Sequence, residues 1–231
     1  MGFRIAPYGR STAVAGTAIL LACAGALYFV HPLAALAPVP FEIFLLSFFR
    51  DPDRAIPDGP GLLVSPADGK VTAIDEVDDA PYLGGRAWRV SIFLSVFNAH
   101  VNRAPAAGRV AYLAYRPGKF LDARHPACAA ENEQNWIGFE RTEPGGGRLL
   151  VKQISGAIAR RIVCAVAEGE PVGRGQRLGM IKFGSRTELY VPVAMKPEPK
   201  VKVGDAVRAG STVLASLPVG APSAASSVQG G

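Results

Sequence analysis

The sequence has few cysteines and no pattern that marks a disulfide framework or a metal site. Its 231 residues contain three cysteines, Cys23, Cys128 and Cys164, which lie far apart, and the first falls in an apolar segment. Disulfide scaffolds and zinc sites need an even set or closely spaced pairs. The spacing therefore indicates a chain of a reducing compartment with no bound metal.

A block of basic residues is also missing. The chain carries 25 Lys and Arg against 19 Asp and Glu, a formal net charge of +6, but these residues are scattered and have few aromatic neighbours. Nucleic-acid-binding surfaces usually gather basic residues on one face. We therefore expect no nucleic-acid partner, and the charge favours an anionic lipid surface or a phosphate-bearing substrate.

The common nucleotide-binding and hydrolase motifs do not occur. There is no G-x-G-x-x-G, P-loop or G-x-S-x-G string, and the glycine-rich run Gly173–Gly179 has the wrong spacing and no βαβ context. The sequence gives no support for a dinucleotide-binding, P-loop or α/β-hydrolase fold.

Charge is almost absent near the N-terminus. Between Ser11 and Phe41 the only candidate for a charge is His31, and Thr12–Val30 is an apolar run long enough to span a bilayer as a helix. Pro32 interrupts this run, and a second apolar stretch, Leu33–Phe49, follows it. Residues 1–54 are therefore predicted to be a membrane anchor of one or two apolar helices.

The charges that flank the two apolar stretches predict their orientation. Arg4 and Arg10 precede the first stretch, and Arg50 and Arg54 follow the second. Because basic residues favour the cytoplasmic side, a helical hairpin in the cell membrane with the rest of the chain in the cytoplasm is expected. One span with an interfacial segment is an alternative. Cleavage after a signal peptide is another, since Ala35–Ala37 resembles a processing site.

Residues 55–217 have the residue pattern of a β domain. Short apolar runs rich in β-branched and aromatic residues alternate with Gly, Pro and Asp. The expected strands are Val90–Phe97, Arg109–Tyr115, Trp136–Arg141, Arg148–Ile154 and Ala157–Val166, with a short helix in Ala127–Glu133. The third and fourth should form a hairpin across a glycine-rich turn. We expect a mainly β sandwich or barrel, followed by a disordered tail over residues 218–231.

A weak internal repeat supports this fold class. Gly169–Gly179 and Gly204–Leu214 share the pattern G-[ED]-x-V-x-x-G followed by an apolar residue. Similar units recur in biotinyl and lipoyl carrier domains, so a pseudo-symmetric β-sandwich related to those domains is expected. The resemblance concerns the fold and carries no function by itself.

Three residues together suggest an activated nucleophile. Asp68 lies in the string S-P-A-D-G-K, His100 follows an apolar strand, and Ser185 directly follows Gly184. Each alone has a structural explanation, as a turn residue or a hydrogen-bonded histidine. In combination, a carboxylate, an imidazole and a hydroxyl are the parts of a serine nucleophile with a base and its orienting group. A serine after glycine could attack the carbonyl of that glycine.

Four strings in this order resemble the short bacterial and archaeal phosphatidylserine decarboxylases. They are F-F-R-D-P-D-R (residues 48–54), S-P-A-D-G-K-V (65–71), H-V-N-R-A-P (100–105) and F-G-S-R (183–186). The similarity runs from about Pro40 to Leu217.

The resemblance implies a proenzyme that cuts itself between Gly184 and Ser185. Ser185 would become a covalent pyruvoyl cofactor at the start of an α chain, residues 185–231, which stays associated with the β chain, residues 1–184. Phosphatidylserine would form a Schiff base with this group and lose CO₂ to give phosphatidylethanolamine.

The resemblance also suggests roles for individual side chains. His100 would transfer protons, and Asp68 would orient it or assist self-cleavage; whether His100 serves self-cleavage, decarboxylation or both stays open. Arg103 and Lys182 are candidates for binding the substrate phosphate, and a homo-oligomer is possible.

Two other functions compete with this one. Val193–Pro197 resembles the A-M-K core of a biotin attachment site, but the internal repeats place the carrier hairpin near Ser185. A pyruvoyl enzyme acting on a soluble amino acid would use the same serine chemistry, but would not need an apolar N-terminal segment.

Overall fold

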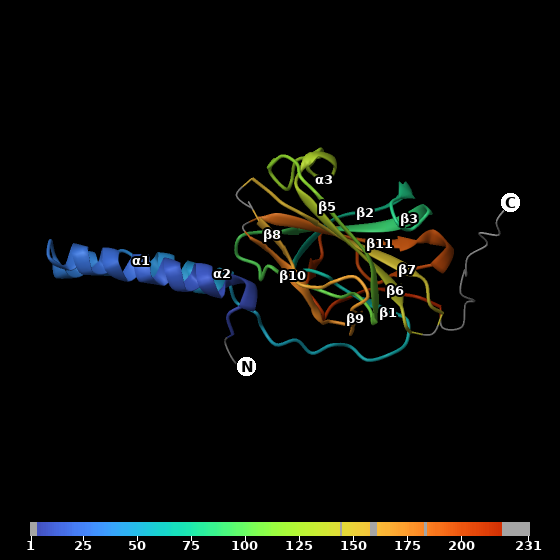
Figure 1. The fold of residues 1–231 in the computed structure, drawn as a ribbon, viewed down its shortest axis with the longest axis horizontal. Helices are drawn as coiled ribbons and strands as arrows, with labels where there is room; N and C mark the ends of the chain where they lie inside the picture. The colour runs from blue at the N-terminus through green and yellow to red at the C-terminus, as the bar shows by residue number, and fades with distance from the viewer. Residues whose placement is uncertain (1–3, 144, 158–160, 183, 219–231) are drawn as a thin grey trace.

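The computed structural model describes residues 4–143, 145–157, 161–182 and 184–218, and shows a helical hairpin that projects from a β domain (Figure 1). Helix α1 (Arg10–Tyr28) follows a 3₁₀ turn, η1 (Pro7–Gly9). Pro32 begins a second 3₁₀ turn, η2 (Pro32–Leu36), because its ring cannot continue the helix, and α2 (Val39–Phe48) returns to the domain. The two predicted apolar stretches are therefore the two arms of one hairpin.

Small and polar side chains fix the contact between the two arms. A Cβ at Gly16 would lie 2.6 Å from Leu45 Cδ2, so the glycine allows α1 and α2 to approach closely. Thr17 Oγ1 donates a 2.8 Å hydrogen bond to Glu42 Oε1, which gives the carboxylate of the second stretch a partner.

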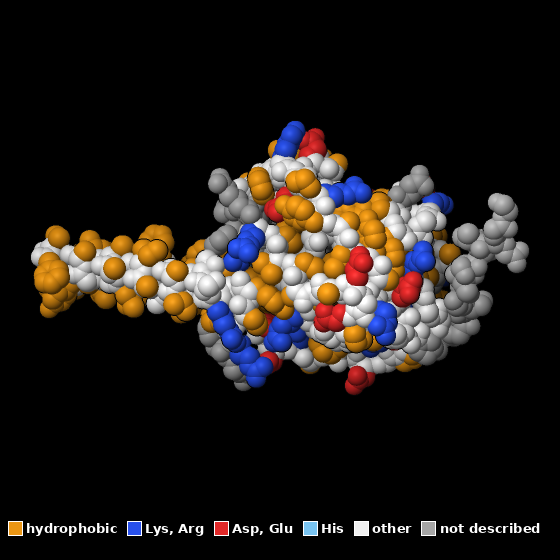
Figure 2. All heavy atoms as spheres, in the orientation of Figure 1, with side chains coloured by type: hydrophobic (Ala, Val, Ile, Leu, Met, Phe, Trp, Pro, Cys, Tyr) orange, Lys and Arg blue, Asp and Glu red, His pale blue; other side chains and the backbone are white. Residues whose placement is uncertain are grey.

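The outer surface of the hairpin is apolar over most of its length (Figure 2). Exposed large side chains gather at its tip, including Tyr28, Phe29, Val30, Leu33 and Leu36. Among the described residues, one helical segment, Pro7–Tyr28, is long and apolar enough to cross a membrane, and Pro32–Phe48 is a shorter apolar one.

Residues beyond the hairpin form an antiparallel β domain with one large curled sheet and two small ones. Short helical segments α3 (Cys128–Glu131) and η3 (Val193–Met195) lie between strands. The strands are β1 (Leu62–Val64), β2 (Gly69–Ala80), β3 (Gly85–Leu94), β4 (Val101–Arg103), β5 (Gly108–Arg116), β6 (Gln134–Arg141), β7 (Arg148–Ile154), β8 (Arg161–Cys164), β9 (Pro171–Val172), β10 (Arg177–Lys182), β11 (Ser185–Pro192), β12 (Glu198–Pro199), β13 (Ala206–Val207) and β14 (Val213–Ser216).

The large sheet has the strand order β13-β2-β3-β11-β7-β6-β5-β9, and the small sheets are β1-β14-β12 and β4-β10-β8. Val90, Ile92 and Leu94 of β3 alternate into the core, where they meet Leu189 and Val191 of β11. This period of two is what a half-buried strand requires.

The predicted mainly β class is confirmed, and the predicted strands agree with β3, β5, β6, β7 and β8 to within a few residues. The hairpin across the glycine-rich turn is the β6–β7 pair, and the short helix is α3. The predicted tail, 218–231, falls outside the described residues from 219 onward.

The sequence repeat corresponds to a repeated arrangement of strands. In the first copy β9 pairs with β5 at Gly108, and in the second β13 pairs with β2 at Gly69. Gly175 and Gly210, which occupy the same place in the two copies, both have positive φ (+76° and +75°). The two copies of the repeat therefore make matching strand pairs, while the pseudo-symmetric sandwich and its relation to carrier domains stay predictions.

Candidate active site

Ser185 is the first residue of β11, a strand in the interior of the large sheet. Its neighbours are β3, where Leu94 lies opposite Ser185, and β7 on the other side. The residue is fully buried, and its Oγ has no hydrogen-bond partner among the residues that the structure describes. A buried hydroxyl without a partner costs free energy, so it calls for a functional explanation.

Gly184 places its carbonyl in a space left free by a second glycine. Its φ is +57°, in the left-handed region that a residue with a Cβ rarely adopts. A Cβ on Gly156 would lie 2.2 Å from Gly184 O and 3.3 Å from Ala123 Cβ. The Gly184 carbonyl therefore packs directly against the Cα of Gly156, and any side chain there would displace it.

The register of β7 and β11 explains the contact between Gly156 and Gly184. Arg186 of β11 lies opposite Ile154 of β7, so continuing the antiparallel register places Ser155 and Gly156 opposite Ser185 and Gly184. Ser155 is buried, and its Oγ, like that of Ser185, has no partner. Sequence reasoning missed this segment because S-G after a strand is an ordinary turn signal.

His100 is buried at the foot of the hairpin. Its ring packs against that of Phe48, the last residue of α2, with the ring centroids 4.3 Å apart and the planes tilted by 35°. Its Nδ1 lies 2.9 Å from Asn98 O. Because a carbonyl oxygen only accepts, Nδ1 carries the proton and Nε2 holds the lone pair. Nε2 is buried without a partner.

Burial, with a smaller contribution from the positive charge of Arg50, lowers the pKa of His100 from 6.5 to about 4. Desolvation disfavours the charged imidazolium, so the ring is neutral near pH 7. The side chain is thus in the state that a general base requires.

Asp68 makes contacts other than the expected one with His100. Arg54 Nη2 donates to both of its carboxylate oxygens, at 2.8 and 2.6 Å, and the Ala209 amide donates to Oδ1 at 2.7 Å. In this arrangement the carbonyl of Asn98 orients the imidazole. A role for Asp68 in self-cleavage stays a prediction.

A buried chain of amides connects the strand after His100 to the strand of Ser185. Asn135 Nδ2 donates to Gln153 Oε1 at 2.9 Å, and Gln153 Nε2 donates to Asn102 Oδ1 at 2.8 Å. Asn102 Nδ2 donates in turn to Thr187 Oγ1 at 3.1 Å. Asn102 lies in the H-V-N-R-A-P string, whereas Asn135, Gln153 and Thr187 lie in none of the four strings, and their only sequence signal is a polar side chain within an otherwise apolar strand.

The two candidates for phosphate binding lie in different environments. Arg103 is buried and donates to Asp51 Oδ1 at 2.6 Å and to Gly175 O at 3.0 Å. Arg177 also pairs with Asp51. Arg103 therefore joins the chain after the hairpin to the β domain. Lys182 is half-buried and donates from Nζ to Thr12 Oγ1 of α1 at 3.0 Å.

Phe183, the first residue of the F-G-S-R string, lies outside the described residues. Gly184, Ser185 and Arg186 of the same string are described. The structure therefore gives the geometry on both sides of the predicted cleavage point.

Comparisons with known proteins identify the family of the chain. A family model described as phosphatidylserine decarboxylase matches residues 41–215. A protein of Symbiobacterium thermophilum is 46% identical over 199 residues, which cover 86% of this chain and 91% of the relative. One from Nitrosomonas europaea is 48% identical over 175 residues, 75% of this chain and 78% of the relative. Both are named phosphatidylserine decarboxylase proenzyme. The chain belongs to the phosphatidylserine decarboxylase family, a family of carboxy-lyases.

Proposed function

We propose that the chain decarboxylates phosphatidylserine to phosphatidylethanolamine with a pyruvoyl group made from its own Ser185. The observation that carries the proposal is the pair Gly184–Ser185 at the start of β11, with a buried, unpartnered hydroxyl after a glycine of positive φ. The proenzyme names of the relatives support a chain that is processed after synthesis.

In the first step, Ser185 Oγ bonds to the carbonyl carbon of Gly184. The hydroxyl proton would pass to His100 Nε2, a neutral buried nitrogen that has no hydrogen-bond partner among the described residues; the two atoms are not hydrogen-bonded to each other in the structure, so this step requires them to approach. The C–N bond then breaks, the nitrogen of residue 185 takes up a proton, and an ester replaces the peptide bond.

In the second step, the ester is removed by β-elimination. Loss of the Cα proton of residue 185 and rupture of its Cβ–O bond release a chain that ends in the carboxylate of Gly184. The remaining dehydroalanine tautomerises to an imine, and water replaces its nitrogen, which leaves as ammonia. The resulting pyruvoyl group supplies an electron sink for the loss of CO₂ from the serine headgroup.

The sheet explains how the two chains would stay together after the cut. The α chain would begin with β11, which is hydrogen-bonded to β3 on one side and to β7 on the other. Both neighbours belong to the β chain. Separation would break two strand ladders and expose the core residues Leu189 and Val191.

We further propose that the hairpin anchors the enzyme in the cell membrane with the β domain on the cytoplasmic side. The apolar tip and the length of Pro7–Tyr28 support insertion. Both ends of the hairpin meet the domain, so the basic residues that flank it lie on one side. Because His100 packs on Phe48 at the foot of the hairpin, the site lies near the level of lipid headgroups.

The intact mass of the purified protein tests self-cleavage. The wild type should give a chain ending at Gly184 and a 47-residue piece, residues 185–231 of 231, with a pyruvoyl N-terminus. The Ser185→Ala variant should stay a single chain. A folded wild type that stays whole would overturn the proposal.

A substrate assay then separates the lipid enzyme from a pyruvoyl enzyme of soluble amino acids. The cleaved protein should release CO₂ from phosphatidylserine in detergent micelles and not from free serine. Release from free serine alone would assign the second function instead.

A further inference from the structure

Two cations lie side by side at the foot of the hairpin without a carboxylate partner. Lys182 of β10 and Arg161 of β8 are opposite each other in the antiparallel register. Neither takes part in a salt bridge within the described part of the chain. Like charges directly opposite each other destabilise a strand pair, so an anion bound between them would reduce the repulsion between the two side chains and stabilise the β8–β10 pair.

The position of Lys182 is fixed by its surroundings. Its Nζ binds Thr12 Oγ1 of α1 and lies 5.8 Å from the centre of the Phe49 ring. Burial and the positive charge of Arg161 lower the pKa of Lys182. An ammonium held in this way has lost part of its hydration and gains more from a bound anion than a freely solvated one does.

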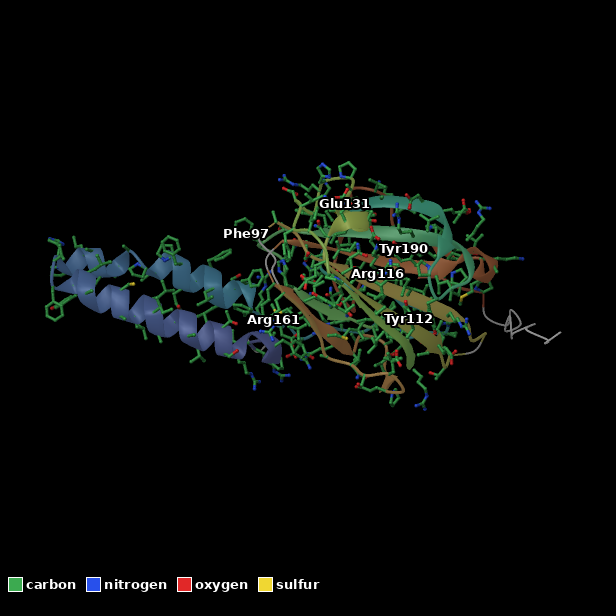
Figure 3. All side chains as sticks on the ribbon, turned by 45° about the horizontal axis from the view of Figure 1, so that its top comes forward. Phe97, Tyr112, Arg116, Glu131, Arg161 and Tyr190 are labelled. Carbon is green, nitrogen blue, oxygen red and sulfur yellow. The ribbon has the colours of Figure 1, made fainter. Side chains whose placement is uncertain are left out.

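The pair lies at the end of the domain from which the hairpin projects. Figure 3 shows Arg161 and Phe97 at this end, near the base of the two helices. Phe97 is 73% exposed. Its ring packs edge-to-face on that of Phe44 of α2, with the ring centroids 6.3 Å apart. An exposed aromatic ring and free cations at one level are typical of a surface that meets lipid headgroups.

Arg50 adds a third positive charge at this foot. Its guanidinium donates to Ser47 O and Phe97 O, at 2.6 and 2.7 Å, and to no carboxylate among the described residues. By contrast, Arg103 has a carboxylate partner, Asp51, which it shares with Arg177. The cations without a carboxylate partner among the described residues, Lys182, Arg161 and Arg50, therefore lie where the hairpin joins the β domain. Lys182 is three residues before Ser185 in the sequence.

We propose that Lys182 and Arg161 bind the phosphate of the phospholipid headgroup and so hold the serine moiety next to residue 185. The guanidinium supplies a planar pair of donors and the ammonium a point charge, a combination suited to phosphate oxygens. The identity of the lipid rests on the proposed function, whereas the phosphate chemistry rests on the two cations.

Kinetics of the full-length protein in detergent micelles test this site. Lys182→Gln and Arg161→Gln should each raise KM for phosphatidylserine about tenfold or more, with little change in kcat, because a charge-assisted hydrogen bond is lost. Self-cleavage should proceed as in the wild type, and Lys182→Arg should restore KM. Lys202→Gln, at an exposed lysine before β13, is the matched control and should change neither constant.

A binding measurement separates this inference from the pyruvoyl mechanism. Calorimetric titration of the full-length Ser185→Ala protein with glycerophosphoethanolamine, the soluble product headgroup, should show binding that Lys182→Gln weakens about tenfold. Titration with inorganic phosphate in parallel tells a headgroup site from a general phosphate site. Unchanged KM and unchanged binding in both glutamine variants would overturn the proposal even if the wild type cleaves itself.

Discussion

Ser185 and His100 each have one buried polar atom, Oγ and Nε2, without a hydrogen-bond partner among the described residues, and the same holds for eight other atoms, including Ser155 Oγ. Most buried polar atoms are hydrogen-bonded, and leaving one unpaired costs about 1–3 kcal/mol. Elsewhere in the same core, Asn102, Gln153 and Thr187 form a connected chain. Among these unpaired atoms, Ser185 Oγ and His100 Nε2 are the hydroxyl and the neutral imidazole nitrogen that the proposed self-cleavage would use.

The neutral state of His100 predicts a pH dependence of stability. Its pKa is about 4 in the folded protein and 6.5 as the reference for the unfolded chain. Between these values the unfolded chain binds more protons, so stability falls as the pH falls. We expect Ser185→Ala to lose about 2 kcal/mol of unfolding free energy from this residue between pH 7 and pH 5.

Chemical denaturation of Ser185→Ala and of Ser185→Ala with His100→Gln, at a series of pH values, measures this contribution. The serine substitution keeps both proteins as single chains, and glutamine has no proton to gain in this range. Parallel curves for the two proteins would contradict the buried neutral histidine.

At the scale of elements, the site is built by strand register. Strands β7 and β11 place Ser155–Gly156 against Gly184–Ser185, and β4 brings Asn102 to Thr187. The base of the hairpin then covers His100 with Phe48. A shift of one residue in the β7–β11 register would turn Ser185 to the opposite face of the sheet.

Gly156→Ala tests the contact between these two strands. The added Cβ would lie 2.2 Å from Gly184 O, so the carbonyl must move and self-cleavage should slow about 100-fold. The rate is measured from the intact mass of protein sampled after synthesis. Addition of hydroxylamine, which cleaves the ester, should not restore the cut if ester formation is the slowed step.

Gly173→Ala is the matched control, since its Cβ would meet only Gln176 Oε1 at 3.9 Å. This variant should cleave at the wild-type rate. A Gly156→Ala protein that is folded and cleaves as fast as the control would show that the carbonyl does not depend on this space.

At the scale of the whole molecule, the hairpin and the β domain form one unit. Phe48, Phe49 and Ala13 of the N-terminal segment pack with Val101 and Met180 of the β domain. A buried ion pair of Asp51 with Arg103 reinforces the joint. The apolar arms extend away from the domain with their tip exposed (Figure 2).

Charges at the tip test the anchor. Phe29 and Leu33 are 90% and 70% exposed, and for the hairpin to insert, an Asp at either position would have to pass through the hydrocarbon core, where it costs up to about 2.5–3.5 kcal/mol at the centre. The double substitution to Asp should move much of the protein from the membrane to the soluble fraction in a flotation assay. Val203→Asp, on an exposed valine of the β domain, should stay with the membrane.

Much of this architecture follows from local sequence. Uninterrupted apolar runs require burial or a membrane, and β-branched runs between turn residues predicted five strands and a β-hairpin. The pair Gly184–Ser185 could be recognised from the sequence because its two residues are adjacent in the chain. The repeat around Gly175 and Gly210 likewise indicated two matching strand arrangements.

The sequence by itself determined the apolar N-terminal segment, the β class and the Gly184–Ser185 pair as the candidate cleavage point, because each depends on neighbouring residues. Tertiary structure alone decided three contacts: Gly156 leaves space for the Gly184 carbonyl, Arg103 forms an ion pair with Asp51, and Lys182 lies opposite Arg161. These partners are separated by some 20 to 50 residues. Their meeting is set by strand register and core packing, which hydrophobic periodicity does not encode pair by pair.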